Sequence, residues 1–246
     1  MADPDYIYRQ SDIDLFEGPF LISQHKFARS LEKRGRALAQ RLSPPRARLR
    51  ERIVEIPLTI AALSRLPAGA PVADIGGASS LLALQLAYLG LRVQVIDLRP
   101  YPLRHPNLAP TQLDLFDNQL PPAAFAAISC ISVIEHVGLA RYGGAERLRG
   151  DLDFIRELRR LCQPAGKIIL SAPYGLGHDP AAGPPHGYRV YDRPGLERLC
   201  QNLTVRQLRF FAIRDGVWLE VTQDEAASTP ATRPINALFW AELINP

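Results

Sequence analysis

The pattern of apolar and polar positions changes near residue 70. From there on, short apolar runs alternate with amphipathic segments, and this alternation is typical of parallel βαβ units. The pattern predicts strands at about 72–76, 92–97, 111–115, 126–132, 167–173 and 204–213, and helices near 79–89, 147–162 and 193–201. The fold class is therefore α/β, with helices on both faces of a mostly parallel sheet.

The C-terminal part of the chain has a different pattern. RFFAIRDGVWLEV (209–221) contains two extended stretches around Asp215-Gly216, a residue pair typical of hairpin turns. ALFWAELI (237–244) is a further apolar run, and no long helix precedes it. We therefore expect a seven-stranded sheet whose last strand is antiparallel.

The first 66 residues are predicted to form a helical extension (1–66) ahead of the main domain (67–246). Ser23 can cap a helix whose apolar face comprises Phe27, Leu31, Leu38 and Leu42. A second helix is expected from about Arg46, with Pro57 ending it. Two interpretations stay open for this extension: amphipathic helices packed on the main domain with solvated arginines, or a lid over the active site.

Composition and charge limit the classes of protein. The chain has 47% hydrophobic residues and no apolar run of membrane-spanning length, and its acidic N-terminus does not resemble a signal peptide. The three cysteines are isolated and form neither a disulfide framework nor a metal motif. We expect a cytoplasmic protein without a metal site or membrane span. Residues 26–52 contain ten Lys/Arg and two Glu, so they carry +8 and leave −4 for the rest of a chain of net charge +4.

The segment VADIGGASS (72–80) joins a buried strand to a helix through a glycine turn. Gly76 and Gly77 let the backbone approach a ligand closely, and Ser79 and Ser80 stand near the helix start, where N–H groups can hold a carboxylate. Asp74 would repel a pyrophosphate but would attract an ammonium group. The third glycine of the dinucleotide fingerprint is also missing. These features favour S-adenosylmethionine over a nicotinamide cofactor.

Two further carboxylates follow at successive strand ends. Asp97 ends the second strand at the spacing where an acidic residue accepts hydrogen bonds from ribose hydroxyls. Asp114 follows the third strand, where it could meet the adenine amino group while Leu115 packs beside the ring. Each alone could be a helix cap or a surface residue, but three in this order indicate a nucleoside site.

Four segments resemble a known family, the bacterial class I (Rossmann-like) methyltransferases of the broad type-11 group. They are DLRPYPLRHPNL (97–108), CISVIEHVGLARYGG (130–144), LCQPAGKIILSAPYG (161–175) and HGYRVYDRPGLERL (186–199). The resemblance implies that the backbone of Ile131 faces the adenosine. The expected cofactor-binding set is Asp74, Gly76, Gly77, Asp97, Leu98, Asp114, Leu115 and Ile131. The chain departs from the family's glycines at Ala78 and Ala165 and from its aspartate at Gly144.

Candidates for the chemistry come from the same segments. His136 follows the fourth strand and could take a proton from the acceptor, with Glu135 orienting the imidazole; alternatively the pair only holds its loop together. The expected acceptor-side residues are Arg141, Tyr142, His178, His186, Arg189 and Tyr191. The loop at 173–188 is either a lid or a surface connection.

The sequence thus predicts an S-adenosylmethionine-dependent methyltransferase acting on a small molecule or carbohydrate, with oxygen as the expected atom. RNA methylation, encouraged by the arginine-rich 26–52 segment, and a non-catalytic binding module are the alternatives. DNA is not expected as a substrate, because SVIEH (132–136) differs from the Asn/Asp-Pro-Pro-aromatic loop of base amino-group methylation. A homodimer is compatible with the sequence.

Overall fold

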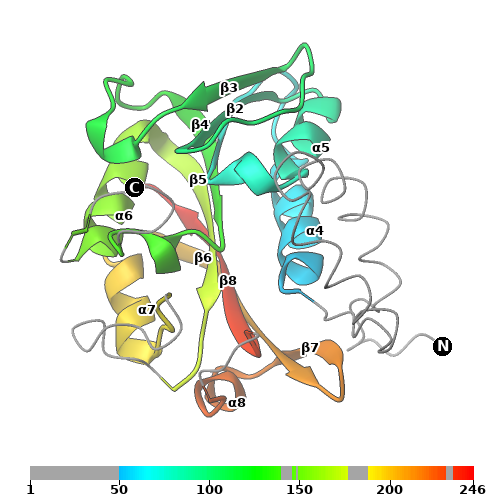
Figure 1. The fold of residues 1–246 in the computed structure, drawn as a ribbon, viewed down its shortest axis with the longest axis vertical. Helices are drawn as coiled ribbons and strands as arrows, with labels where there is room; N and C mark the ends of the chain where they lie inside the picture. The colour runs from blue at the N-terminus through cyan, green and yellow to red at the C-terminus, as the bar shows by residue number, and fades with distance from the viewer. Residues whose placement is uncertain (1–49, 140–145, 148, 177–187, 231–234) are drawn as a thin grey trace, which may run out of the picture.

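The computed structural model describes residues 50–139, 146–147, 149–176, 188–230 and 235–246. They form one sheet of eight strands in the order β3-β2-β1-β4-β5-β8-β6-β7 (Figure 1). The strands are β1 (Pro71–Ile75), β2 (Arg92–Asp97), β3 (Leu108–Gln112), β4 (Phe125–Ile131), β5 (Cys162–Pro173), β6 (Thr204–Arg214), β7 (Val217–Val221) and β8 (Ala237–Ile244). The first five pair in parallel, and β8 inserts antiparallel between β5 and β6.

The predicted antiparallel last strand is confirmed, but the predicted number of seven strands is wrong. The eighth strand is β7, the second arm of the hairpin that turns at Asp215 and Gly216. Both turn residues have positive φ, 52° and 80°, as a tight hairpin turn requires. The side chain of Trp218 on β7 is fully buried, so the hairpin extends the sheet instead of forming a loop.

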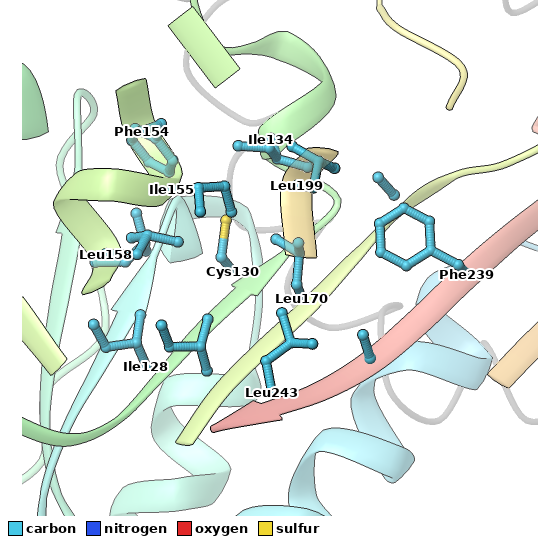
Figure 2. Packing of buried hydrophobic residues seen from close by; sticks show 14 of the residues in the cluster. Ile128, Cys130, Ile134, Phe154, Ile155, Leu158, Leu170, Leu199, Phe239 and Leu243 are labelled. Atoms are coloured by element: carbon cyan, nitrogen blue, oxygen red, sulfur yellow. The ribbon is translucent and has the colours of Figure 1, made fainter. Parts of the chain in front are cut away.

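Helices cover both faces of the sheet, as expected. On one face, α6 (Gly150–Leu161) and α7 (Arg193–Cys200) pack on the apolar cluster around Cys130 and Leu170 (Figure 2). On the other face lie α4 (Arg52–Leu63) and α5 (Leu82–Tyr88), which share a second apolar cluster with the sheet (Figure 1). A short helix, α8 (Gln223–Ala227), follows the hairpin.

Two predicted elements have different bounds in the structure, because a capping side chain follows one and an extended residue divides the other. Asp114 caps the 3-10 turn η2 (Leu115–Asp117) by accepting from the N–H of Phe116, so β3 ends at Gln112 instead of 115. The helix predicted at 79–89 is divided into a 3-10 turn, η1 (Gly77–Ser79), and α5, because Ser80 is extended.

The predicted break at Pro57 is wrong, since α4 continues through it to Leu63. An internal proline costs a helix about 3 kcal/mol, but α4 buries Val54, Thr59 and Leu63 completely. This burial outweighs the lost hydrogen bond. The helix expected around 27–42 lies outside the described residues, and the domain boundary at residue 66 stays a prediction.

In the described part of the chain, no helix is long and apolar enough to cross a membrane.

Candidate functional site

The order of the sheet reverses between β1 and β4, because the chain runs outward from β1 to β3 and then returns to β4. In open α/β sheets, ligands bind outside the carboxyl ends of the strands at such a switch point. The turn after β1 and the turn after β4 therefore face the same crevice. The predicted residues from Asp74 to Gly77 and from Ile131 to His136 follow these two strands.

The glycine turn has no room for side chains. Gly76 has φ of +73°, and a Cβ there would lie 2.3 Å from Cγ2 of Val133. A Cβ on Gly77 would lie 2.3 Å from Oδ2 of Asp74. Both positions therefore require glycine, and the backbone of Gly77 lies directly against the carboxylate.

Asp74 is buried, with 2% of its surface exposed. Its Oδ1 accepts a hydrogen bond of 2.7 Å from Oγ of Ser129, whereas Oδ2 has no donor among the described residues. Burial raises the pKa of Asp74 to about 6, although the Ser129 hydrogen bond and the charge of Arg52 oppose the shift. An orphaned buried carboxylate oxygen fits a cationic ligand.

Asp97, at the end of β2, is held by several donors. Its Oδ2 accepts from the N–H of Ala78 at 2.9 Å, and its Oδ1 accepts from the N–H and Nε of Arg99. Arg99 also donates to Oγ of Ser79 at 3.0 Å. These bonds tie the end of β2 to the glycine turn, so the carboxylate is fixed in place.

The remaining predicted cofactor residues differ in the groups that they contact. Asp114 uses Oδ1 for its cap, and the side chain of Leu115 packs in the core. The carbonyl of Leu98 accepts from Nε2 of Gln112, and that of Ile131 accepts from Nη1 of Arg52. The structure thus places all of them along one edge of the sheet, with Leu115 directed into the interior.

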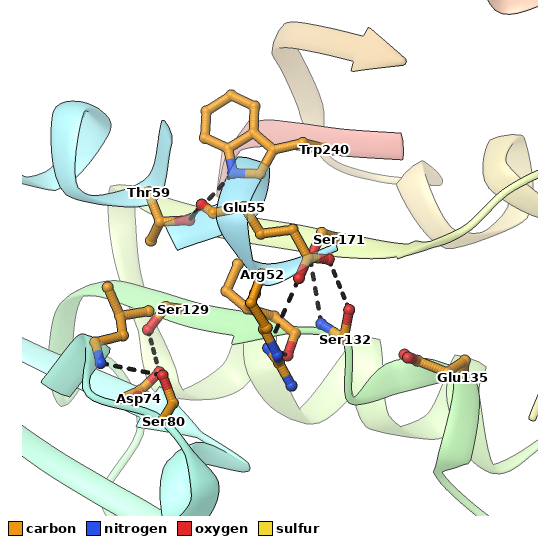
Figure 3. A network of polar contacts seen from close by, with 12 residues as sticks. Arg52, Glu55, Thr59, Asp74, Ser80, Ser129, Ser132, Glu135, Ser171 and Trp240 are labelled. Atoms are coloured by element: carbon orange, nitrogen blue, oxygen red, sulfur yellow. Dashed lines mark hydrogen bonds and ion pairs between the residues drawn. The ribbon is translucent and has the colours of Figure 1, made fainter. Parts of the chain in front are cut away.

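Sequence reasoning missed Arg52 and Glu55, two residues of α4 that reach this edge (Figure 3). Glu55 is fully buried, and its Oε1 accepts from Oγ of Ser132 at 2.6 Å and of Ser171 at 2.7 Å. Its Oε2 lies 3.8 Å from Nη1 of Arg52. Burial raises the pKa of Glu55. The sequence signal that could have identified Glu55 is its position as a charged residue within the apolar run IVEIPL (53–58).

Ser132, the first residue after β4, has a positive φ of 49°. This conformation is strained for a residue other than glycine. It is held by the bonds to Glu55 and by the carbonyl of Ser171, which accepts from the Ser132 N–H at 3.1 Å. The Glu55 side chain of α4 therefore helps to hold the backbone where the turn after β4 begins.

Glu135 and His136 lie in the 3-10 turn η3 (Ile134–His136). Nε2 of His136 is 3.8 Å from Oε1 of Glu135, and the imidazole packs edge-on against the ring of Tyr188. The Glu135 side chain is 1% exposed, and burial raises its pKa well above the ordinary value. Its Oε2 has no hydrogen-bond donor among the described residues.

Arg189 and Tyr191, predicted on the acceptor side, are buried beneath this turn. Nη1 of Arg189 donates to the carbonyl of Val137 at 2.6 Å, and the hydroxyl of Tyr191 lies 3.1 Å from Oδ2 of Asp151. The N–H of Arg189 donates to the carbonyl of Glu135. Both side chains thus support η3. Arg141, Tyr142, His178 and His186 lie outside the described residues.

Comparison with known proteins places this geometry in context. No family model matches the chain. A ubiquinone biosynthesis O-methyltransferase of Xanthomonas axonopodis pv. citri (strain 306) is 31% identical over 126 residues, 47% of each chain, so the chain spans about half the length of this curated relative.

Solved structures match over more of the chain. One of them is the N-methyltransferase NodS from Bradyrhizobium japonicum in complex with S-adenosylhomocysteine, which superposes with a TM-score of 0.55. The match covers 86% of this chain and 97% of NodS, and the sequence identity is 16%. A Burkholderia thailandensis 1,6-didemethyltoxoflavin N1-methyltransferase gives 0.50 with 15% identity over 99% and 92% of the two chains. The fold is the Rossmann-like methyltransferase fold.

The same fold also carries other chemistry. The [4+2]-cyclase SpnF superposes with a TM-score of 0.57 and 16% identity, over 83% of this chain and 84% of its own. Likeness at this level shows the fold and leaves the activity to be argued from the site.

Proposed function

We propose that this protein is an S-adenosylmethionine-dependent methyltransferase that modifies a small-molecule or carbohydrate acceptor at oxygen. The observation that carries the proposal is the orphaned, buried Oδ2 of Asp74 beside a turn that accepts only glycine. A carboxylate in this position suits the ammonium group of an amino acid. It does not suit the pyrophosphate of a dinucleotide, which needs N–H groups and positive charge there.

The other groups around the turn fit the rest of the donor molecule. Arg52 stands between Asp74 and Glu55 (Figure 3), where its guanidinium suits a carboxylate. Asp97 is fixed at the end of β2 to accept from ribose hydroxyls, and Asp114 follows β3 on the side proposed for adenine. Since the glycine turn links these groups, one elongated nucleoside with an amino-acid end fits them in order.

S-adenosylmethionine, when bound, supplies a methyl group on a positively charged sulfonium, which is a good leaving group. The chain's own residues then have to orient the acceptor, exclude water and remove one proton. We propose that the imidazole of His136 accepts the proton of the acceptor hydroxyl. Oε1 of Glu135, which lies 3.8 Å from Nε2 of His136, then stabilises the imidazolium that forms.

The choice of oxygen as the methylated atom follows the relative with the higher sequence identity. The Xanthomonas relative is an O-methyltransferase, whereas NodS and the toxoflavin enzyme are N-methyltransferases. We favour oxygen because the sequence similarity reaches 31% only with the first. Methylation of RNA is the second candidate, because residues 26–52 carry a net charge of +8.

The test is a methyl-transfer screen with labelled donor over sugars, phenols, amines and RNA, using the full chain. We expect label in a hydroxyl-bearing small molecule, and NMR of the product identifies the methylated atom. Asp97→Asn serves as the control that should lose transfer. Label confined to RNA would favour the second candidate, and cofactor binding without transfer to any acceptor would favour a binding module.

A further inference from the structure

Glu135 has one buried carboxylate oxygen, Oε2, that the described residues leave without a hydrogen-bond donor. The side chain as a whole is almost fully buried. A buried carboxylate oxygen left without a partner costs free energy, because no protein donor replaces the water that it lost on burial. A buried oxygen without a partner requires an explanation, and one explanation is a bound ligand that supplies the missing donor.

Among the basic groups near Glu135, His136 lies 3.8 Å from Oε1, whereas two arginines contact other groups. Arg52 donates to the carbonyl of Ile131 and lies 3.8 Å from Glu55. Arg189 donates to the carbonyl of Val137, and its Nε is 3.7 Å from Oδ2 of Asp151.

Other acidic residues add to the negative charge around Glu135. The charges of Glu55 and Glu51 disfavour its ionised form, while Arg52 favours it. Glu55 is itself buried on α4, which packs against the sheet beside this turn. None of these groups gives Oε2 a hydrogen-bond donor among the described residues.

The proposed donor does not meet this need. Figure 3 shows Asp74 and Glu135 on opposite sides of Arg52, one on β1 and the other beyond β4. The donor has one ammonium group, which Asp74 and its orphaned Oδ2 suit better. His136 lies beside Oε1 of Glu135, so the acceptor is the remaining source of a cationic partner for Oε2.

We propose that the acceptor carries a protonated amine, which pairs with Oε2 of Glu135 while a hydroxyl of the same molecule receives the methyl group. This inference rests on the proposed function and narrows its substrate class to amino alcohols, amino sugars or hydroxylated arylalkylamines. An organic ammonium fits better than a metal ion, because no group of three or more His, Cys, Asp or Glu side chains gathers for a metal in the part of the chain that the structure describes. The ring of Tyr188, packed against His136, adds an aromatic surface that suits an alkylammonium.

The test uses related probes with and without an ammonium group: tyramine with its hydroxyl analogue tyrosol, and glucosamine with its hydroxyl analogue glucose and its neutral amide N-acetylglucosamine. Binding to the protein loaded with S-adenosylhomocysteine is measured by calorimetry, and transfer is measured with labelled donor. We expect the ammonium member of a pair to bind at least about tenfold more tightly than its neutral counterpart. Glu135→Gln should reduce this ratio to about one, while the affinity for S-adenosylhomocysteine stays unchanged.

Asp153→Asn is the matched control, because it removes one negative charge from the exposed face of α6. It should keep the preference for ammonium. Equal binding of charged and neutral probes by the loaded wild-type protein would overturn the inference, and so would a Glu135→Gln protein that retains the preference. Failure to bind S-adenosylhomocysteine would instead overturn the proposed function.

Discussion

At the scale of single residues, the carboxylates along the sheet edge differ in how their oxygens are used. Asp97 accepts from Ala78 and Arg99 and is fixed in place. Asp74 and Glu135 each have one buried oxygen without a donor among the described residues. Fixed acceptors suit recognition of neutral hydroxyls, whereas orphaned carboxylates suit cations, so each residue predicts a different response to substitution.

Asp97→Asn should weaken S-adenosylmethionine binding by about 1.5–3 kcal/mol, because a charged acceptor for the ribose is lost. Asparagine keeps an oxygen for the Ala78 N–H, so the fold should persist. Calorimetry gives the dissociation constant, and circular dichroism checks folding. An unchanged affinity in a folded variant would remove Asp97 from the ribose site.

Asp74→Asn should lose affinity for the donor but gain stability at neutral pH. Burial raises the pKa of Asp74 from 3.8 to about 6, so the folded protein binds this proton more tightly than the unfolded chain does. The stability that this proton contributes is present below pH 4 and is lost as the pH rises through about 6. The loss is of the order of 3 kcal/mol.

Asparagine does not ionise, so the variant should lose less stability than the wild type between pH 4 and 7. Urea unfolding at both pH values measures the difference. The pKa values of Glu55 and Glu135 are raised as well. Because both proteins contain these two residues, their contribution to the pH dependence of stability cancels when the proteins are compared. The same pH dependence in both proteins would contradict the assignment.

His136→Ala should lower the rate of methyl transfer by about 10²–10⁴-fold with little change in donor affinity, if the imidazole takes the acceptor's proton. The defect should shrink at high pH, where the acceptor hydroxyl ionises without help. Single-turnover kinetics across pH measures this, with His136→Asn as the variant that retains a polar contact. Normal turnover in both variants would show that His136 serves the structure of the turn.

At the scale of elements, α4 links the N-terminal part of the chain to the site. The hydroxyl of Thr59 receives a hydrogen bond from Trp240 on β8, and one turn away Glu55 binds the serines at the ends of β4 and β5. The helix thus spans the sheet face from β8 to the edge where the site lies.

Two deletions separate α4 from the residues before it. Removal of 1–45 should leave donor affinity nearly intact and lower methyl transfer sharply, if that segment forms a lid. Removal of 1–66 should abolish folding, because α4 contributes the fully buried Val54 and Leu63 to the second apolar cluster. Thermal unfolding and calorimetry on both proteins test this, and unfolding of the shorter deletion would support a packing role for the segment instead.

At the scale of the whole molecule, the reversal of strand order brings the ends of β1, β2 and β4 together at one edge of the sheet. The unpartnered carboxylate oxygen of Asp74 at this edge suits an ammonium group and does not suit a pyrophosphate. The protein should therefore bind S-adenosylmethionine and S-adenosylhomocysteine with dissociation constants of the order of micromolar and bind NAD weakly. Competition calorimetry measures the ranking, and a preference for NAD would overturn the cofactor assignment.

The sequence by itself predicted most of the strands and helices, because apolar periodicity and glycine turns are local signals. The positions of Asp74, Gly76 and Asp97 at or beside strand ends could be predicted in the same way. The eighth strand of the sheet could not be predicted, because the second arm of a hairpin becomes an edge strand only when a residue such as Trp218 packs into the core.

The tertiary structure alone decided the role of α4 and of the buried residues near η3. Arg52 and Glu55 meet Ile131, Ser132 and Ser171 across separations of 77 residues or more, which no local pattern encodes. The burial that carries α4 through Pro57 is equally non-local. Long-range packing thus determines which carboxylate oxygens are paired and which have no donor among the described residues.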